Sequence, residues 1–295
     1  FFMSLWEVIA GDIAAATGQQ AELSGQVTAG GGCINQAMRV RYGDDYYFIK
    51  LNAASRADMF AAEAMGLREL QSSHTLKVPE PVCHGADGES AWLVLEDLQL
   101  GGRGDLAELG EGLAAMHRVT RDRFGWETDN TIGATLQVNS TDHDWISFWR
   151  SQRLQFQLEL AAQNGYGGRL QAQGEQLLES FPALFAGYSP EASLLHGDLW
   201  SGNYGFTTSG EPTIFDPAVY YGDREADLAM TELFGGFGAD FYAAYRAACP
   251  LDAGYGVRKT LYNLYHILNH LNMFGDGYRP QAQRMMDSLL AELSM

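Results

Sequence analysis

The chain has 295 residues, 46% of them hydrophobic, which is enough for one or two folded domains with a substantial core. Its formal net charge of −18 argues against nucleic acid and anionic membranes as partners, since both select basic surfaces. No apolar run approaches the roughly 18 residues that a membrane span needs. The three widely spaced cysteines exclude a disulfide framework or a cysteine zinc site, and the N-terminus lacks the pattern of a signal peptide. These features predict a cytoplasmic protein.

The first third of the chain is predicted to form strands and one helix. Two β-rich runs flank Gly43-Asp44-Asp45, which is typical of a hairpin. Residues 57–70 combine good helix formers with apolar positions at helical spacing. KVPEPVCHG (77–85) must be extended or turning because of its prolines, and AWLVLEDL (91–98) predicts a buried strand. A glycine-rich connection follows, and we place the boundary between two lobes there.

The remainder is predicted to be mainly helical. Residues 105–118 place apolar side chains on one helical face, with Asp105 able to cap the start. Residues 144–163 predict one long helix. Short strands around a Thr-Ser-Gly turn are expected within residues 194–216, and helical patterns return from about residue 225.

Three consecutive glycines, Gly30, Gly31 and Gly32, lie between strand-like segments in TAGGGCINQAMRV. Glycine leaves backbone N–H groups free to approach phosphate oxygens without interference from a Cβ atom. The alternative is an ordinary glycine-rich hairpin turn. The motif is neither a Walker loop nor a dinucleotide-binding fingerprint, because no Gly-Lys-Ser/Thr follows and no helix opens after it.

Lys50 ends a strand-like run, and Glu63 lies in the middle of the helix predicted next. An ion pair between them would hold the lysine ammonium at the α- and β-phosphates of ATP. Taken separately, each residue is more simply explained as a charged side chain in water.

The stretch LLHGDLWSGN and the later TIFDP supply Asp198, Asn203 and Asp216. Phosphoryl transfer needs a carboxylate at the acceptor and oxygen ligands for Mg²⁺, which is a hard ion. The order of glycine-rich loop, strand lysine, helix glutamate, aspartate, asparagine five residues later and second aspartate is that of the protein-kinase template. Six elements in the correct order outweigh the separate alternatives.

The predicted fold class is therefore α+β, with a bilobal, protein-kinase-like arrangement. Residues 1–98 would form a small lobe with an antiparallel sheet that binds ATP. Residues 99–295 would form a larger, mainly helical lobe with the catalytic and substrate-binding residues.

Departures from the template indicate the type of kinase. Gly197 stands where protein kinases have the arginine that reads activation-loop phosphorylation, and Trp200 stands in place of a lysine. Pro217 follows Asp216 and favours an extended backbone there. Only about ten residues separate Asp216 from the helix expected at Ala226, which leaves no room for a peptide-docking segment. A small acceptor is therefore expected.

The strings GGGCIN, VPEPVCHG, LVLEDL, LHGDLWSGN and FDPAVYYGDREADLAMTELFGG resemble the fructosamine kinase / ketosamine-3-kinase family over nearly the whole chain. The resemblance implies ATP-dependent phosphorylation of the sugar 3-hydroxyl of ketoamines, which are fructosamine or ribulosamine adducts of amines or lysines. Loss of the unstable 3-phosphate would then reverse glycation. The expected partner is a small-molecule or protein-bound ketoamine, and the chain is expected to be a monomer or a homodimer.

Roles follow from the resemblance residue by residue. Asp198 would accept the proton of the sugar hydroxyl, and Asn203 and Asp216 would hold Mg²⁺. The nucleotide-binding residues would be Gly30, Gly31, Gly32, Cys33, Asn35, Lys50, Glu63, Glu96, Asp97 and Leu98, the last three through backbone groups at the adenine. His196 and Asp227 would brace the loop that carries Asp198.

Four further residues have two readings each. Trp200 would form an apolar wall against the ketoamine or pack within the large lobe. Asp223 and Arg224 would reach the substrate or merely cap the helix that follows. Cys33 would be a redox-sensitive thiol or simply a small loop residue.

His266 and His270 share one helix, and without a third ligand nearby we expect them to pack rather than bind metal.

Two other functions remain as alternatives. An aminoglycoside- or choline-type phosphotransferase would share the fold but need a different acceptor pocket. An ATP-binding pseudokinase that serves as a partner module is disfavoured, because Lys50, Asp198, Asn203 and Asp216 are all present.

Overall fold

The computed structural model describes residues 4–30 and 34–295, which form two compact units. Unit 1 comprises Phe1–Asp105 and Gly202–Pro217, and unit 2 comprises Leu106–Ser201 and Ala218–Met295. The predicted lobes divided the chain once, after residue 98. In the structure the chain instead leaves unit 1 after Asp105, returns at Gly202 and leaves again after Pro217.

Unit 1 is built on one antiparallel sheet of five strands in the order β1-β2-β3-β5-β4. Its strands are β1 (Leu23–Thr28), β2 (Gln36–Tyr42), β3 (Asp45–Ala53), β4 (Pro81–Ala86) and β5 (Ser90–Glu96). The predicted hairpin joins β2 to β3, with Tyr42 paired to Asp45. Gly43 occupies the turn at φ +63°, a conformation that glycine adopts without steric cost.

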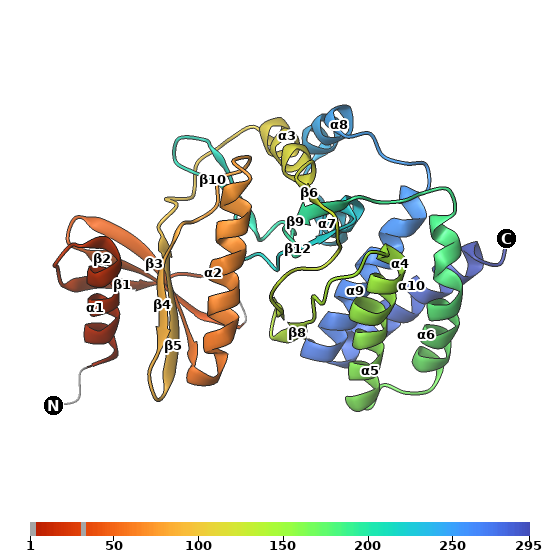
Figure 1. Cartoon of the computed structure of the whole chain (residues 1–295), viewed down its shortest axis with the longest axis horizontal. Helices are drawn as coiled ribbons and strands as arrows, with labels where there is room; N and C mark the ends of the chain where they lie inside the picture. Colours follow the sequence, from red (N-terminus) through yellow and green to blue (C-terminus); the bar gives the residue numbers. More distant parts are fainter. Residues whose placement is uncertain (1–3, 31–33) are drawn as a thin grey trace. The chain divides into compact units, whose positions relative to one another are not determined.

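One helix covers each face of this sheet (Figure 1). Helix α1 (Leu5–Thr17) buries Ile9 and Ile13 in a cluster with Val40, Ile49 and Trp92. Helix α2 (Ala57–Ser72), which follows the short 3₁₀ helix η1 (Ala54–Arg56), lies against the other face. The sheet is thereby shielded on both sides, and residues 49–51 of its central strand β3 are buried.

A small hairpin from later in the chain belongs to unit 1. Strands β10 (Tyr204–Phe206) and β11 (Pro212–Ile214) pair with each other. Backbone bridges tie them to earlier residues, since Thr213 pairs with Lys77 and Thr207 pairs with Leu100. A Cβ atom on Gly102 would lie 1.8 Å from the Thr207 carbonyl oxygen, so this close backbone approach requires glycine. These contacts explain why residues 202–217 pack with the sheet rather than with the helices.

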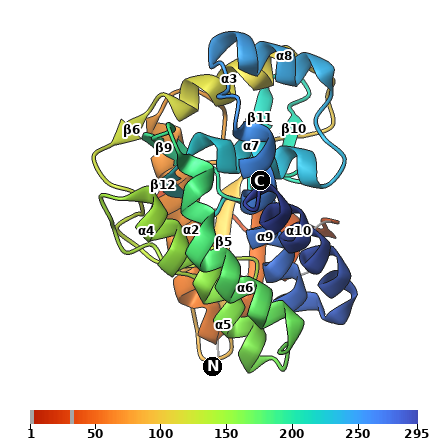
Figure 2. The same cartoon turned by 90° about the vertical axis from the view of Figure 1, so that its right-hand side faces the viewer.

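Unit 2 is mainly helical, with α5, α6, α9 and α10 side by side (Figure 2). Its helices are α3 (Leu106–His117), α4 (Trp145–Trp149), α5 (Gln155–Gln163), α6 (Arg169–Ser180), α7 (Arg224–Leu233), α8 (Ala239–Ala248), α9 (Tyr255–Phe274) and α10 (Arg279–Glu292), with short 3₁₀ turns η3 (Phe181–Phe185) and η4 (Asp276–Tyr278). None of the helices in residues 4–30 and 34–295 is long and apolar enough to cross a membrane.

The helix expected over residues 144–163 is not uniform. A π-helical segment η2 (Arg150–Leu154) joins α4 to α5. It contains the fully buried Arg153, whose guanidinium donates to the Val138 carbonyl at 2.6 Å and to Asn139 Oδ1 at 2.7 Å. These hydrogen bonds join the helix to residues outside it, and the helical periodicity of the sequence does not predict them.

The short strands of unit 2 support one loop. Strand β9 (Ala192–Leu195) lies between β12 (Tyr220–Gly222) and β6 (Thr120–Arg121), and all four of its residues are buried. A second hairpin pairs β7 (Asn130–Ile132) with β8 (Thr135–Gln137). The loop after β9 is the HGD segment singled out in the sequence. With the sheet of unit 1 and the helices of unit 2, the predicted α+β class is confirmed.

Candidate active site

Unit 1 brings together Lys50, Glu63 and Asp216. Lys50 lies on β3 and is 6% exposed, and its Nζ atom is 2.5 Å from Glu63 Oε1 on α2. The same Nζ atom is 2.5 Å from Asp216 Oδ1, just after β11. Burial alone would lower the pKa of Lys50, but the charges of Asp216 and Glu63 outweigh it and raise the pKa above its ordinary value. The lysine is therefore a fixed cation.

The backbone at Asp216 differs from the expectation. The prolyl residue after it predicts an extended conformation, whereas Asp216 adopts φ +54°, in the left-handed region. The ion pair with Lys50 and the hydrogen bond from Phe215 N to Asn203 O, 3.0 Å long, hold this turn on both sides. A strained backbone of this kind persists only where surrounding contacts determine it, and such positions cluster at functional sites.

Asn203 and Asp216 meet at the open end of the β10–β11 hairpin. Asn203 precedes β10 and Asp216 follows β11, so the pairing of Tyr204 with Ile214 fixes their separation. Asn203 is 4% exposed, whereas the Asp216 side chain is 44% exposed. An amide and a carboxylate suit Mg²⁺, which favours oxygen ligands, keeps several waters and takes further ligands from substrate phosphates. No cluster of three His, Cys, Asp or Glu side chains suited to a metal occurs in the part of the chain that the structure describes.

The other predicted nucleotide-binding residues also lie in unit 1. The Asn35 side-chain oxygen accepts from Asn52 Nδ2 at 2.7 Å, which anchors the end of the glycine-rich loop to β3. Gly30 has open space around its Cα atom. Gly31, Gly32 and Cys33 lie outside the described residues.

At the end of β5, the Glu96 carboxylate accepts from Lys77 Nζ at 3.1 Å and from Glu80 N at 3.2 Å. Asp97 accepts from Arg39 Nε at 2.7 Å. The two side chains are thus engaged within unit 1, and Leu98 is buried.

Unit 2 holds the loop that carries Asp198. The buried Asp227 carboxylate on α7 accepts from the backbone N–H groups of His196 and Gly197, each at 2.8 Å. His196 is fully buried, and its Nδ1 atom accepts from Asp198 N at 3.2 Å. Asp198 itself is half-buried. Asp227 and His196 therefore hold the loop through its backbone N–H groups.

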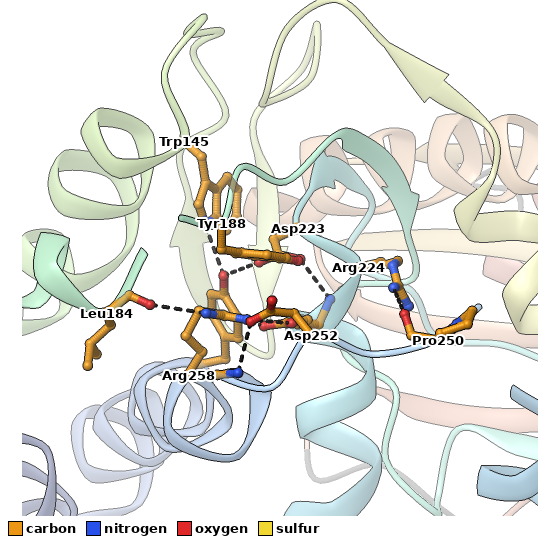
Figure 3. A network of polar contacts seen from close by, with 11 residues as sticks. Trp145, Leu184, Tyr188, Asp223, Arg224, Pro250, Asp252 and Arg258 are labelled. Atoms are coloured by element: carbon orange, nitrogen blue, oxygen red, sulfur yellow. Dashed lines mark hydrogen bonds and ion pairs between the residues drawn. The ribbon is translucent and has the colours of Figure 1, made fainter. Parts of the chain in front are cut away.

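Asp223 proves to be a buried cap. Its carboxylate accepts from Glu225 N at 3.0 Å, from the Tyr188 hydroxyl at 2.9 Å and from the Tyr262 hydroxyl. Asp223 is 0% exposed, so the capping alternative describes its contacts. Figure 3 shows the network around it, in which the Arg258 guanidinium stacks 3.7 Å from the centre of the Tyr188 ring.

Arg224 and Trp200 differ in what they contact. The Arg224 guanidinium donates to Pro250 O at 2.5 Å and to the Tyr245 hydroxyl at 3.1 Å, which ties α7 to the end of α8 (Figure 3). Trp200 is 38% exposed and meets Phe234 edge-on, with the ring centres 6.1 Å apart. Trp200 thus remains open to a ligand, whereas Arg224 is engaged in packing.

The predicted helical histidines are packing residues. His266 is 5% exposed, and burial lowers its pKa to about 3. His270 Nδ1 donates to the His266 carbonyl at 2.7 Å, and its ring lies 5.2 Å from that of Phe234.

The buried carboxylate of Asp223 gives a prediction for pH dependence. Burial, followed by repulsion from Glu225, raises its pKa to about 7 despite the hydrogen bonds it accepts. The folded state then binds a proton that the unfolded chain releases near pH 4, so stability is highest at low pH and falls as the pH rises through 7. We expect the unfolding free energy to drop by on the order of 3 kcal/mol between pH 5 and pH 8.

Urea unfolding at several pH values measures this slope. Asp223→Asn is the control, because asparagine caps helices equally well but does not titrate. The slope should flatten in that variant, and an unchanged slope would assign the pH dependence to other groups.

Two buried residues of unit 2, His117 and Tyr245, gave no functional signal in the sequence. His117 lies at the end of α3. Its Nε2 atom is 3.0 Å from Asp227 Oδ2, and its Nδ1 atom is 2.7 Å from the Tyr245 hydroxyl. A histidine closing an amphipathic helix is the sole sequence feature that marks the position.

Comparison with known proteins identifies the family of this chain. The sequence profile of the fructosamine kinase family matches residues 5–292. The chain is 46% identical over 289 residues to the "Probable ketoamine kinase" of Synechocystis sp., covering 97% of each protein. It is 43% identical over 273 residues to the chloroplastic protein-ribulosamine 3-kinase of Arabidopsis thaliana, covering 90% of this chain and 82% of that one.

Solved structures share the fold. The "Putative fructosamine-3-kinase" of Haemophilus somnus 129PT superposes with a TM-score of 0.88 at 26% identity, covering 96% of each chain. An aminoglycoside phosphotransferase superposes with a TM-score of 0.66 at 17% identity, covering 98% of each chain, which shows a common fold alone. The predicted kinase-like fold and the predicted family are both confirmed. This chain belongs to the fructosamine kinase family.

Proposed function

We propose that this protein is an ATP-dependent kinase that phosphorylates the sugar 3-hydroxyl of ketoamines. The observation that carries the proposal is the ion triad of Lys50, Glu63 and Asp216 in a chain that also presents Asp198 on a braced loop. Relatives named ketoamine kinase and protein-ribulosamine 3-kinase support the same acceptor class. The 3-phosphate product is unstable, and its loss would free the amine and reverse glycation. A cytoplasmic location fits an enzyme that draws on cellular ATP.

The nucleotide would bind through unit 1. Lys50, held by Glu63, would contact the α- and β-phosphates, and backbone N–H groups of residues 30–35 would cover the others. The backbone of Glu96–Leu98 would meet the adenine. Lys50 is a suitable phosphate ligand because two carboxylates already fix its ammonium and keep it charged.

Asn203 and Asp216 would hold Mg²⁺ on the ATP phosphates. When bound, the ion would neutralise charge that develops on the transferred phosphoryl group. Two observations support this pair: the left-handed turn at Asp216, and the β10–β11 pairing that sets the spacing of Asn203 from Asp216.

Asp198 would act on the acceptor. Its carboxylate would orient the 3-hydroxyl and take its proton as the oxygen–phosphorus bond forms and the bond from the γ-phosphorus to the β,γ-bridging oxygen breaks. ADP is the leaving group. Asp227 is a positioning residue here, since it holds His196 and Gly197 rather than the substrate.

An acceptor panel tests the proposal. Purified protein is assayed for ATP consumption with ribulosamine, fructosamine, an aminoglycoside and choline, each with and without Mg²⁺. Turnover of the ketoamines supports the proposal. Turnover of the aminoglycoside or choline alone would replace it with the second phosphotransferase class, and ATP binding without any turnover would favour a non-catalytic partner module.

Trp200 gives a prediction about the acceptor. The exposed ring beside Phe234 offers an apolar face to sugar C–H groups and a π surface to the cationic amine. We expect Trp200→Ala to raise KM for the ketoamine by about tenfold, as for the loss of one aromatic contact, with KM for ATP unchanged. Steady-state kinetics in both substrates measure this.

Tyr46→Ala is the control for Trp200, because Tyr46 is 40% exposed and lies on β3 in unit 1. Trp200→Phe should retain most of the affinity. Equal KM values for the ketoamine in Trp200→Ala and the unaltered protein would show that the ring serves packing alone.

A further inference from the structure

Four buried or half-buried side chains of unit 2 form one hydrogen-bonded chain that ends at the catalytic loop. Arg224 Nη1 on α7 donates to the Tyr245 hydroxyl on α8 at 3.1 Å. That hydroxyl lies 2.7 Å from His117 Nδ1 at the end of α3, and His117 Nε2 lies 3.0 Å from Asp227 Oδ2. The chain therefore links three helices to the carboxylate that holds the loop.

The chemistry of the four groups gives each bond a direction. A guanidinium can only donate, so the Tyr245 oxygen accepts from Arg224. Among the contacts described, His117 Nδ1 is the acceptor in reach of the Tyr245 hydrogen. Burial raises the pKa of Tyr245, which keeps that hydrogen in place. His117 Nδ1 is then an acceptor, and the ring proton resides on Nε2, where it donates to Asp227.

The carboxylate at the end of the chain is ionised. Burial alone would raise the pKa of Asp227, but the hydrogen bond from His117, with a further hydrogen bond from Gly197 N, lowers it below its ordinary value. A doubly protonated His117 would donate from Nδ1 as well, which would leave the Tyr245 hydrogen without an acceptor among the contacts described. The neutral Nε2–H form satisfies all of the groups.

The position of the loop depends on how this carboxylate is turned. Asp227 Oδ2 receives both the His117 ring and His196 N, while Oδ1 receives Gly197 N. The His117 and Asp227 side chains are 0% and 1% exposed, so water cannot replace a lost donor without rearrangement. Without the His117 bond the carboxylate can rotate, and the two backbone groups just before Asp198 follow it.

We propose that His117 is a positioning residue for phosphoryl transfer, with Tyr245 and Arg224 fixing its tautomer and His117 fixing Asp227. The kinetic part of this inference rests on the proposed function, whereas the tautomer does not. Arg224, expected from the sequence to reach the substrate or cap a helix, is on this reading the remote anchor of the catalytic loop.

The first experiment compares His117→Phe, His117→Gln and Tyr245→Phe in the full chain with a ketoamine substrate. His117→Phe should lower kcat by about 100-fold with both KM values little changed, the loss expected for a misplacement of about 1 Å. His117→Gln retains a donor to Asp227 and should recover at least about tenfold of that loss. Tyr245→Phe frees the tautomer and should lower kcat by less than His117→Phe.

Tyr255→Phe is the matched control. Tyr255 is a buried tyrosine of the same unit whose hydroxyl donates to Glu232 at 2.7 Å, outside the chain of four residues. The Tyr255→Phe variant should have a lowered melting temperature, as Tyr245→Phe does, but an unchanged kcat. If kcat in the His117 and Tyr245 variants falls no further than in this control, the positioning role is overturned.

The second experiment needs no turnover. Nitrogen-15 NMR of the histidine rings in the unaltered protein should show His117 as the neutral Nε2–H form, and Tyr245→Phe should disturb that pattern. A charged ring or the Nδ1–H form would overturn the proposal. Should His117→Phe fail to fold, Tyr245→Phe and the NMR result still decide it. Absence of ketoamine turnover in the unaltered protein would count against the proposed function and leave the NMR arm in force.

Discussion

Asp198→Asn is expected to lower kcat by about 10²–10⁴-fold, the range for a positioned general base, while the dissociation constant for ATP stays within about twofold. The substitution keeps the size of the side chain and removes its capacity to take the proton of the acceptor hydroxyl. The loop should stay in place, because Asp227 binds it through His196 N and Gly197 N and not through Asp198. The proposed nucleotide contacts all lie in unit 1.

Three measurements separate the base from other roles. Ketoamine turnover gives the loss in kcat, calorimetric titration gives ATP affinity, and the melting temperature shows that the fold persists. Lys50→Met serves as the contrast, since it should weaken ATP binding as well as turnover. Retention of more than about a tenth of the activity in Asp198→Asn would remove the residue from the role of base.

The elements of this fold that could be predicted are those set by local sequence. The Gly43 hairpin, the helix of residues 57–70 and the strand of residues 91–98 depend on turn chemistry and periodicity, and each appears within one or two residues of its expected bounds. The association of Lys50 with Glu63 was also accessible, because the order of motifs along the chain indicated the fold and the fold brings the two together.

What the sequence could not supply depends on contacts between distant segments. Arg153 is buried and donates hydrogen bonds to Val138 and Asn139. The predicted helix contains a π-helical segment at this position. Asp216 takes a left-handed backbone although a proline follows it, since Lys50 holds its side chain. Neither outcome follows from local preferences, because in both cases a charged group finds its partner elsewhere in the chain.

The glycine in HGD is a third position that is constrained by a distant segment. Gly197 adopts φ +86°, and a Cβ atom there would lie 1.9 Å from the Ala218 carbonyl oxygen. That carbonyl cannot move aside easily, since it accepts from Gln137 Nε2 at 3.1 Å and Ala218 N donates to His196 O at 2.8 Å. The absence of the protein-kinase arginine at this position is thus enforced by backbone packing.

Gly197→Ala should therefore cost about 2–5 kcal/mol of stability, the sum of left-handed strain and overpacking, and lower kcat by at least about 100-fold through displacement of the loop. Gly165→Ala is the matched control: Gly165 has φ +91° with open space around it, so that variant incurs the strain of about 1–2 kcal/mol alone and leaves kcat unchanged. Urea unfolding and ketoamine kinetics compare the two. Equal losses of stability in the two variants, with turnover retained in both, would show that the close approach of Ala218 does not constrain the loop. Glycine would then be required at position 197 for its left-handed backbone conformation, and not for packing against the segment that follows Pro217.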